Sequence, residues 1–436
     1  MIRALAVASV LAASVCAQVF VVDAANGAGA HFTDLPAAVA AVPDGATLRV
    51  RAGDYTAFSL AAKGLVIVGE GVVTFSAGGT VAIGPTRADQ VIVLRDLTLP
   101  RAGQVRIVDA LGPVILERCH RDVGLTFASI VTDVVALRAA NVQLLGCVFD
   151  QRFLGFSGDP PAAVDATDSV LSLAACRVLG NAALTPAFAT RGNNGGIALA
   201  LVRARAVLSH CTVVGGAGSP GCRSCGIGCS YDGGVGGAAC RAENATVVLL
   251  ASTLQGGVGG VRGCCSLSQQ CTCPGNGGGG LALVSSAAFL LGQQPLGGAP
   301  GGTTCGAQAG APVLYSGTNT VHSDATARPP LARIDGVQAT GQNIAFTVLS
   351  PAGSVALLAI AYDGALLPIE PIGHGSLLAS ASGFVGPFTV PPGDLLQLPW
   401  PVPGTFAVGR VHFGQFLTLA NGAIFASNPF PLLVAQ

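Results

Sequence analysis

The sequence predicts an all-β chain: a right-handed parallel β-helix of about nine or ten rungs with an N-terminal capping helix, followed by a small β-sandwich. Two observations carry this prediction. One apolar pattern recurs along most of the chain, and a polar linker then separates it from segments with a different pattern. Each repeat has apolar residues five and three positions before a final ladder position. The ladder positions are Leu97, Cys119, Cys147, Cys176, Cys211, Ser252 and Gln294.

The spacing within each repeat indicates short strands around one core. Side chains alternate along a strand, so the positions five and three before the ladder residue share one face. They hold Ile92 and Leu94 in the first repeat and Phe289 and Leu291 in the last. A further inward column is expected twelve residues before the ladder, at Ile107, Val135, Val164, Leu199 and Cys240. Each repeat therefore supplies about three strands of a coil.

A short helix is expected before the first rung, because the end of a stacked coil needs a cap. Asp34 is a favourable N-cap residue, and the apolar segment Leu35 to Val42 follows it. Pro43, Asp44 and Gly45 then end the helix. The apolar face of this helix is expected to cover the open first rung.

The segments PDGATLRV, RAGDY and GLVIVGEG follow Phe32-Thr33 in this region. With the helix between them, they resemble the entry of the pectin-lyase-like superfamily of right-handed β-helix proteins, which includes pectinesterases and pectate lyases. The resemblance covers residues 31 to 325 in architecture and residues 31 to 75 in local sequence. It implies a polysaccharide lyase or glycoside hydrolase as one possible activity. The enzyme signatures of the family, such as paired aspartates with Gly-His-Gly and Arg-x-Lys, are absent from the sequence.

The composition and the first residues indicate an exported globular protein. Of 436 residues, 51% are hydrophobic and 10% are charged, so a large core can be buried. The net charge of zero indicates no nucleic-acid partner. Arg3, an apolar run and small residues predict a signal peptide over residues 1–17, cleaved after Ala17, and a secreted or extracytoplasmic location. Cys16 leaves a lipoprotein signal as an alternative, and no later segment is apolar enough to span a membrane.

Removal of the signal peptide leaves 13 cysteines in two groups. Five fall in the inward columns and are expected to be free thiols in the core: Cys119, Cys147, Cys176, Cys211 and Cys240. The other eight are expected to form disulfides in the loops 215–236, 255–280 and 297–312, with zinc binding as the alternative. These eight are Cys222, Cys225, Cys229, Cys264, Cys265, Cys271, Cys273 and Cys305.

The same loops are the expected binding edge, because insertions from a rigid scaffold often carry function. Guanidinium groups pair with carboxylate or sulfate, and aromatic rings stack on sugars, so a polysaccharide is the expected partner. The alternative is that these arginines only keep the chain soluble, since Lys63 is the single lysine. The ligand-binding candidates are Arg152, Arg191, Arg223, Tyr231, Asp232 and Arg262.

Asp122 and Asp150 each lie three residues after a ladder cysteine, which stacks them on adjacent rungs. Such a pair of carboxylates can act as acid and base or hold calcium, the one cofactor considered, and His120 and Arg152 are nearby. The alternative is a solvated turn, where aspartate is common. These four residues are the catalytic candidates.

The linker DATARPP precedes a segment, 331–436, with short apolar runs split by Gly, Pro and Asp. This pattern predicts a β-sandwich, and the segment resembles the C-terminal β-sandwich modules of exported planctomycete-type proteins. The expected protein is therefore a monomeric, noncatalytic, exported β-helix protein that binds polysaccharide or serves the cell envelope. The alternative is a carbohydrate-active enzyme acting at the loop edge.

Overall fold

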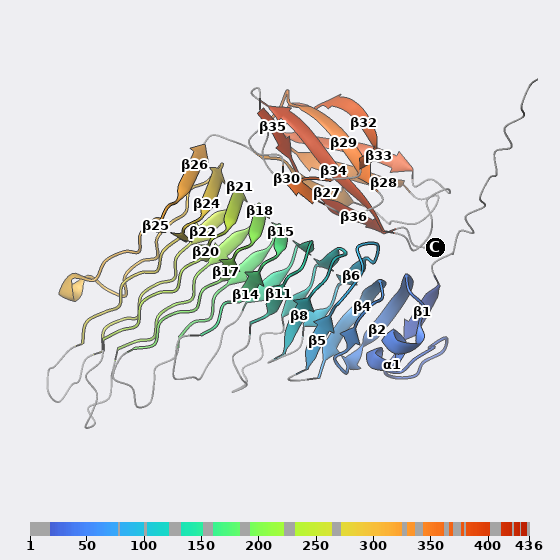
Figure 1. The fold of residues 1–436 in the computed structure, drawn as a ribbon, viewed down its shortest axis with the longest axis horizontal. Helices are drawn as coiled ribbons and strands as arrows, with labels where there is room; N and C mark the ends of the chain where they lie inside the picture. The colour runs from blue at the N-terminus through green and yellow to red at the C-terminus, as the bar shows by residue number, and fades with distance from the viewer. Residues whose placement is uncertain are drawn as a thin grey trace, which may run out of the picture.

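The computed structural model describes residues 18–76, 79–99, 103–121, 132–150, 160–183, 192–221, 232–263, 272–324, 329–335, 343–361, 366–368, 376–378, 381–401, 411–420, 423–427 and 429–433. Within these ranges the chain is nearly all-β. Long parallel sheets come first, and a separate antiparallel region follows (Figure 1). The described helices are α1 (Leu35–Ala41) and the 3-10 helix η1 (Thr304–Gly306). No described helix is long and apolar enough to cross a membrane.

The parallel part consists of three sheets. The first sheet has eleven strands: β1 (Val19–Val22), β2 (Ala46–Tyr55), β4 (Leu65–Phe75), β6 (Ile92–Arg95), β9 (Val114–Glu117), β12 (Val142–Leu145), β15 (Val170–Ala174), β18 (Arg205–Ser209), β21 (Thr246–Leu250), β24 (Ala287–Leu291) and β26 (Thr320–Asp324). The second sheet has six strands: β7 (Thr98–Leu99), β10 (His120–Arg121), β13 (Val148–Asp150), β16 (Arg177–Leu179), β19 (Thr212–Val214) and β22 (Thr253–Gln255). The third sheet has nine strands: β3 (Ser59–Leu60), β5 (Thr80–Ile83), β8 (Gln104–Val108), β11 (Val134–Leu137), β14 (Val164–Thr167), β17 (Leu199–Val202), β20 (Cys240–Glu243), β23 (Leu281–Val284) and β25 (Val313–Ser316).

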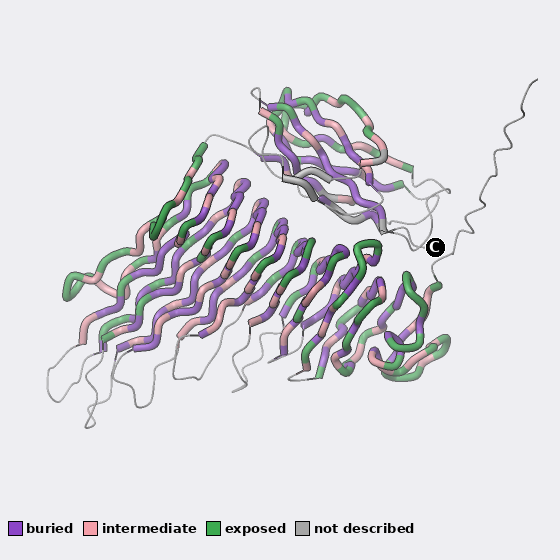
Figure 2. The backbone as a smooth tube through the Cα atoms, viewed as in Figure 1, coloured by how far each residue is buried: buried purple, intermediate pink, exposed green. Residues whose placement is uncertain are grey.

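Successive strands enter the three sheets in turn, as β9, β10 and β11 do. Each strand pairs in parallel with the equivalent strand of the next repeat, for example Leu116 of β9 with Leu144 of β12. The inward side chains of the three sheets form one apolar core that runs the length of the parallel part. Exposed positions gather at its two ends, around α1 and around β25 and β26 (Figure 2).

The five cysteines of the predicted inward columns lie inside this core. Cys119, Cys147, Cys176, Cys211 and Cys240 are all buried free thiols. The Cys147 thiol donates to the carbonyl of Leu116 at 3.2 Å, which satisfies it without a disulfide. Burial raises the pKa of Cys240 to about 12, so this thiol stays protonated at neutral pH.

We expect these five thiols to resist alkylation in the native protein, because a reagent can reach them only when the core opens. Mass spectrometry of unreduced protein, treated with iodoacetamide before and after denaturation, should find them modified only after denaturation. A disulfide between any two of them would contradict the inward assignment.

The register corrects two of the predicted columns. Val247 of β21 pairs with Ala288 of β24, so the inward residues of β24 are Ala288 and Leu290. The predicted Phe289 and Leu291 point outward. The bridge between Gln255 and Leu296 places Gln293, which is exposed, in register with Ser252, where the prediction had Gln294. A shift of one residue moves every side chain of a strand to the opposite face. The prediction that Val135 faces the core was wrong for the same reason. Val135 pairs with the exposed Arg106, while Val134 and Ala136 face the core.

Two side chains far apart in sequence, Asp34 and Lys63, cap the two ends of helix α1. The Asp34 carboxylate accepts a hydrogen bond from the backbone N–H of Leu35 at 2.9 Å. At the other end, the Lys63 ammonium donates to the carbonyls of Val39, Ala40 and Val42 at 2.9, 3.3 and 2.6 Å. The single lysine of the chain therefore caps the carbonyl end of the helix, where a positive charge is favourable.

Replacing Lys63 with methionine should lower the free energy of unfolding by about 1–2 kcal/mol, since it removes charged hydrogen bonds to helix carbonyls. Urea denaturation of the full chain measures this loss. As a control, Arg87→Met removes an exposed cation that pairs with Asp89, and should change stability by less than about 0.5 kcal/mol. Equal effects of the two substitutions would argue against the capping role.

The antiparallel region contains a three-stranded sheet of β27 (Leu331–Asp335), β28 (Asn343–Leu349) and β33 (Leu395–Pro401). A second sheet contains β32 (Ala381–Thr389), β29 (Val355–Ala361), β34 (Val411–Ala420), β35 (Ala423–Ala426) and β36 (Phe430–Leu433), and β30 (Leu366–Pro368) pairs with β31 (Ser376–Leu378). Trp400 lies 5.8 Å from Phe346, ring centre to ring centre, beside the core of this region. Trp400 therefore packs against the core of this region.

The antiparallel region packs on the outward face of the first sheet (Figure 1). Ala361 and Phe413 share one buried cluster with the outward residues Val93, Ile115 and Leu145 of β6, β9 and β12. The sequence holds a signal for this contact, because outward positions of a solvent-facing sheet are normally polar. Here they are apolar on successive strands.

Candidate functional site

The described structure contains part of the predicted site. Of the catalytic candidates, His120 and Asp150 are described, while Asp122 and Arg152 lie outside the described residues. Among the ligand-binding candidates, Asp232 and Arg262 are described, and Arg152, Arg191, Arg223 and Tyr231 are not. Among the loop cysteines, Cys273 and Cys305 form a disulfide with a Cα–Cα distance of 5.5 Å. The other six, Cys222, Cys225, Cys229, Cys264, Cys265 and Cys271, lie outside the described residues.

His120 and Asp150 share the outward face of the second sheet. His120 is paired in register with Val148, two residues before Asp150. The His120 ring nitrogen Nε2 lies 3.0 Å from the Thr98 hydroxyl, so a neighbouring strand already provides it with a hydrogen-bond partner. No group of three or more His, Cys, Asp or Glu side chains in the described ranges is placed to hold a metal ion. Calcium binding at Asp122 and Asp150 therefore stays a prediction.

Arg121 follows His120 on β10, and its side chain points to the opposite, inward face of the second sheet. It occupies an inward position that holds Leu99 on one neighbouring strand, and it forms an ion pair with Asp133. The two side chains are 3% and 1% exposed, so both charges lie inside the apolar core. Burial lowers the pKa of Arg121 to about 10, which still leaves the guanidinium charged at neutral pH. The sequence marks Arg121 as an exception in an apolar column but does not identify Asp133 as its partner.

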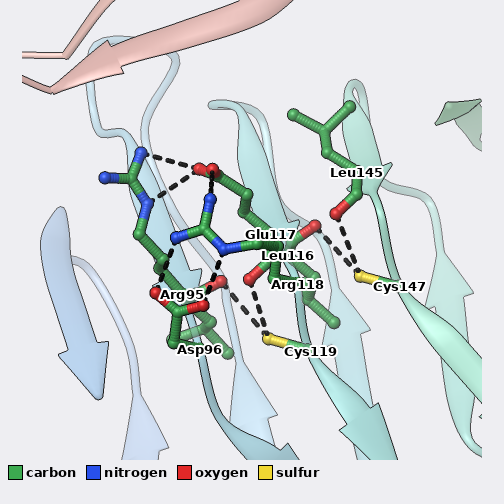
Figure 3. A network of polar contacts seen from close by, with 9 residues as sticks. Arg95, Asp96, Leu116, Glu117, Arg118, Cys119, Leu145 and Cys147 are labelled. Atoms are coloured by element: carbon green, nitrogen blue, oxygen red, sulfur yellow. Dashed lines mark hydrogen bonds and ion pairs between the residues drawn. The ribbon is translucent and has the colours of Figure 1, made fainter. Parts of the chain in front are cut away.

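Arginine and aspartate alternate at two corners of the parallel part. Arg138 pairs with Asp109 at 2.6 Å, and Arg203 pairs with Asp168 at 2.7 Å. These hydrogen bonds lower the pKa of both aspartates. At the other corner Arg118 holds Asp96 through two bonds of 2.7 and 2.6 Å, close to the Cys119 thiol (Figure 3). These arginines neutralise carboxylates on adjacent rungs, which favours a structural role for them over binding a polyanion.

Glycine-rich legs continue the second sheet after its strands and lead into the strands of the third sheet (Figure 1). Outgoing legs continue from the second sheet at residues 180–183, 215–221, 256–263 and 296–302. Return legs lead back into the third sheet at residues 192–198, 232–239, 272–280 and 307–312. Together they form two layers.

Backbone hydrogen bonds join the legs within each layer at every third residue. In the outgoing layer, the N–H groups of Gly215, Gly218 and Gly221 donate at 2.8 Å to the carbonyls of Gln255, Val258 and Val261. A period of three residues is that of an extended polyproline II chain. The legs therefore form an ordered lattice of backbone hydrogen bonds. The sequence predicts only that disulfides hold these loops.

A second set of hydrogen bonds joins the two layers. Gly216 donates to Gly196, Gly237 to Gly216, Gly257 to Gly237, and Gly278 to Gly257, each at 2.8 Å. The backbones approach so closely that only glycine fits. A Cβ atom at Gly257 would lie 1.9 Å from the Gly216 carbonyl oxygen. The repeated Gly-Gly-x pattern, as in GGVGGV at residues 256–261, is the sequence signal for this lattice.

The legs repeat every three residues, and the third side chain of each repeat points away from the lattice. On the return layer these side chains tie neighbouring legs together: Asn194 accepts from the N–H of Val235, and Asp232 accepts from the N–H of Cys273 at 2.6 Å. Asp232, a predicted ligand-binding residue, therefore has a structural partner. Arg262 is exposed at the far end of an outgoing leg.

The outer face of the outgoing layer is apolar and continues the outward face of the second sheet. Val258, Val261 and Leu296 are 45%, 41% and 53% exposed on it. We name this surface the outgoing face. It comprises Thr212 and Thr253 of the second sheet and Val214, Ala217, Pro220, Gln255, Val258, Val261, Leu296 and Ala299 of the strand ends and legs. None of these side chains is charged, and the exposed Arg177 and Arg262 border the face, so its centre is suited to binding an uncharged partner.

No family model matches this chain, and no curated protein matches it. Its class therefore follows from its own architecture. It is a nearly all-β protein with long parallel sheets, a separate antiparallel region and glycine legs that extend two of the parallel sheets.

Proposed function

We propose that this chain is an exported, noncatalytic protein that binds polysaccharide through the outgoing face. The observation that carries this proposal is the wide exposed surface of uncharged side chains on legs held by backbone hydrogen bonds. Sugar rings present C–H groups on their faces, so an aliphatic surface can cover them. A surface that is rigid before binding loses little conformational entropy when the polymer binds.

In this proposal the three parallel sheets form a right-handed parallel β-helix of the pectin-lyase-like type, and the antiparallel region is a β-sandwich. The regular passage of the chain through three sheets supports the first part. Antiparallel pairing in two main sheets around one core supports the second. The predicted signal peptide supports export, and the monomeric state is kept as part of the proposal.

The corner ion pairs favour a neutral polymer over a polyanion. Arg118, Arg138 and Arg203 are each bound to an aspartate on a neighbouring rung, so a polyanion would have to displace these carboxylates. A binding role is favoured over catalysis because His120 is hydrogen-bonded to Thr98 in the second sheet.

A depletion assay tests this function. The mature protein is mixed with insoluble cellulose, chitin and pectin, and the protein left in solution is measured together with released reducing and unsaturated ends. We expect depletion by at least one neutral polymer and no release of ends. Release of ends that disappears in a folded Asp150→Ala variant would overturn the noncatalytic proposal, and no depletion by any polymer would overturn binding.

A further inference from the structure

We infer that the polymer bound by the outgoing face is a sheet-packed polysaccharide of N-acetylated sugars. This inference rests on the proposed function and adds the substrate class. Three features of the described residues lead to it: the charge of the face, its spacing and the chemistry of its side chains.

The charge of the face fits a polymer of neutral sugars. The side chains that make up the outgoing face are uncharged. Two exposed arginines border it: Arg177 pairs in register with Thr212, and Arg262 follows Val261. On the face itself, acidic polymers such as polyuronates would lie against side chains that cannot pair with their carboxylates. They would then lose hydration of their carboxylates without compensation.

The spacing of the face fits acetamide groups. Adjacent legs are joined by N–H···O=C bonds, such as Gly218 to Val258 and Gly259 to Ala299 at 2.8 and 2.9 Å. Parallel chains joined in this way repeat at about 4.8 Å. N-acetylated sugar chains that stack through their acetamide groups use the same N–H···O=C bond and therefore repeat at nearly the same distance. Side chains on successive legs can then contact successive chains of the polymer.

The side chains of the face fit acetyl methyl groups and sugar rings. Along one leg, Val258 and Val261 are one turn of three residues apart, which is about 9 Å in an extended polyproline II chain. Ala217 and Ala299 lie beside Val258 on the neighbouring legs. Acetyl methyl groups can pack against these small aliphatic side chains, and the exposed Thr212 hydroxyl can bond to a sugar hydroxyl.

The test compares chitin with cellulose, which is equally insoluble and uncharged but lacks acetamide groups, and with chitosan, its deacetylated form. The proteins are the mature full chain, a Val258→Asp/Val261→Asp variant, and a Val235→Asp control. Val235 is 41% exposed, like Val261, but lies on the return layer. Depletion isotherms give the affinity, and circular dichroism with native thiol alkylation confirms folding.

We expect chitin to bind the wild type, and the double aspartate substitution to weaken binding by about tenfold or more because it places charges against a neutral polymer. The Val235→Asp control should bind as the wild type does. Chitosan and cellulose should bind more weakly than chitin. Equal binding to cellulose and chitin would overturn the acetamide inference and leave the proposed function standing, whereas no binding to any polymer would overturn both. Loss of binding only in Val235→Asp would place the site on the other layer and overturn the inference.

Discussion

Replacing Asp133 with alanine is expected to lower the free energy of unfolding by about 3–5 kcal/mol, because it removes the carboxylate that pairs with the buried Arg121 guanidinium. Both side chains are almost fully buried, and the pKa of Arg121 remains far above neutral pH. Arg121 therefore cannot lose its charge cheaply when the partner is removed. Chemical denaturation at pH 7 measures the loss.

The matched control removes both charges. On the next rung, the positions equivalent to Asp133 and Arg121 hold Ala163 and Phe149, so an apolar pair already fits this place in the coil. The double variant Arg121→Leu/Asp133→Ala should recover most of the lost stability, to within about 1 kcal/mol of the wild type, since an apolar pair avoids the desolvation cost. A double variant as unstable as Asp133→Ala would show that the loss comes from packing and not from the unpaired charge.

Replacing Gly257 with alanine should disrupt the glycine lattice and cost about 2–3 kcal/mol, in the upper range for inserting a methyl group into a packed site. Gly257 donates to Gly237 and accepts from Gly278, so its neighbours cannot retreat without breaking hydrogen bonds between the layers. The added Cβ would lie 1.9 Å from the Gly216 oxygen. Hydrogen exchange should show faster exchange of the leg amides, with the cysteine core less affected.

Gly302 provides the control for this substitution. A Cβ atom there meets only Pro274, at 3.5 Å, which is an ordinary contact. Gly302→Ala should change stability by less than about 1 kcal/mol, and it removes backbone freedom from the unfolded chain as Gly257→Ala does. If both substitutions cost the same, close packing of the legs is not the reason for their glycine content.

The repeat pattern was informative because each rung meets the same constraint. Leu94, Leu116 and Leu144 recur at one position because each contacts the equivalent residue of the next strand. The same columns separated the buried free thiols from the loop cysteines. The pattern was weaker at Phe289, where consecutive apolar residues allow two registers. There the side that faces the core depends on pairing with β21.

The candidate site was less predictable from the sequence. Loop cysteines and arginines predicted a binding edge at this corner, but the surface there depends on glycines that contact residues far away in sequence, as Gly257 contacts Gly216. The predicted binding residues Arg152, Arg191 and Arg223 lie outside the described residues. Other arginines, Arg138 and Arg203, bind aspartates one rung away. A partner on the next rung cannot be assigned until the length of each repeat is known.

The sequence by itself determined that the chain is all-β, that its first part repeats, and which cysteines lie inside, because alternation along a strand is a local property. Only the tertiary structure decided the register of β24, the pairing of Arg121 with Asp133, the contact between the antiparallel region and the first sheet, and the two-layer lattice of the legs. These features arise from contacts between residues on different rungs or in different parts of the chain. Their energies depend on close approach and burial, which no local pattern specifies.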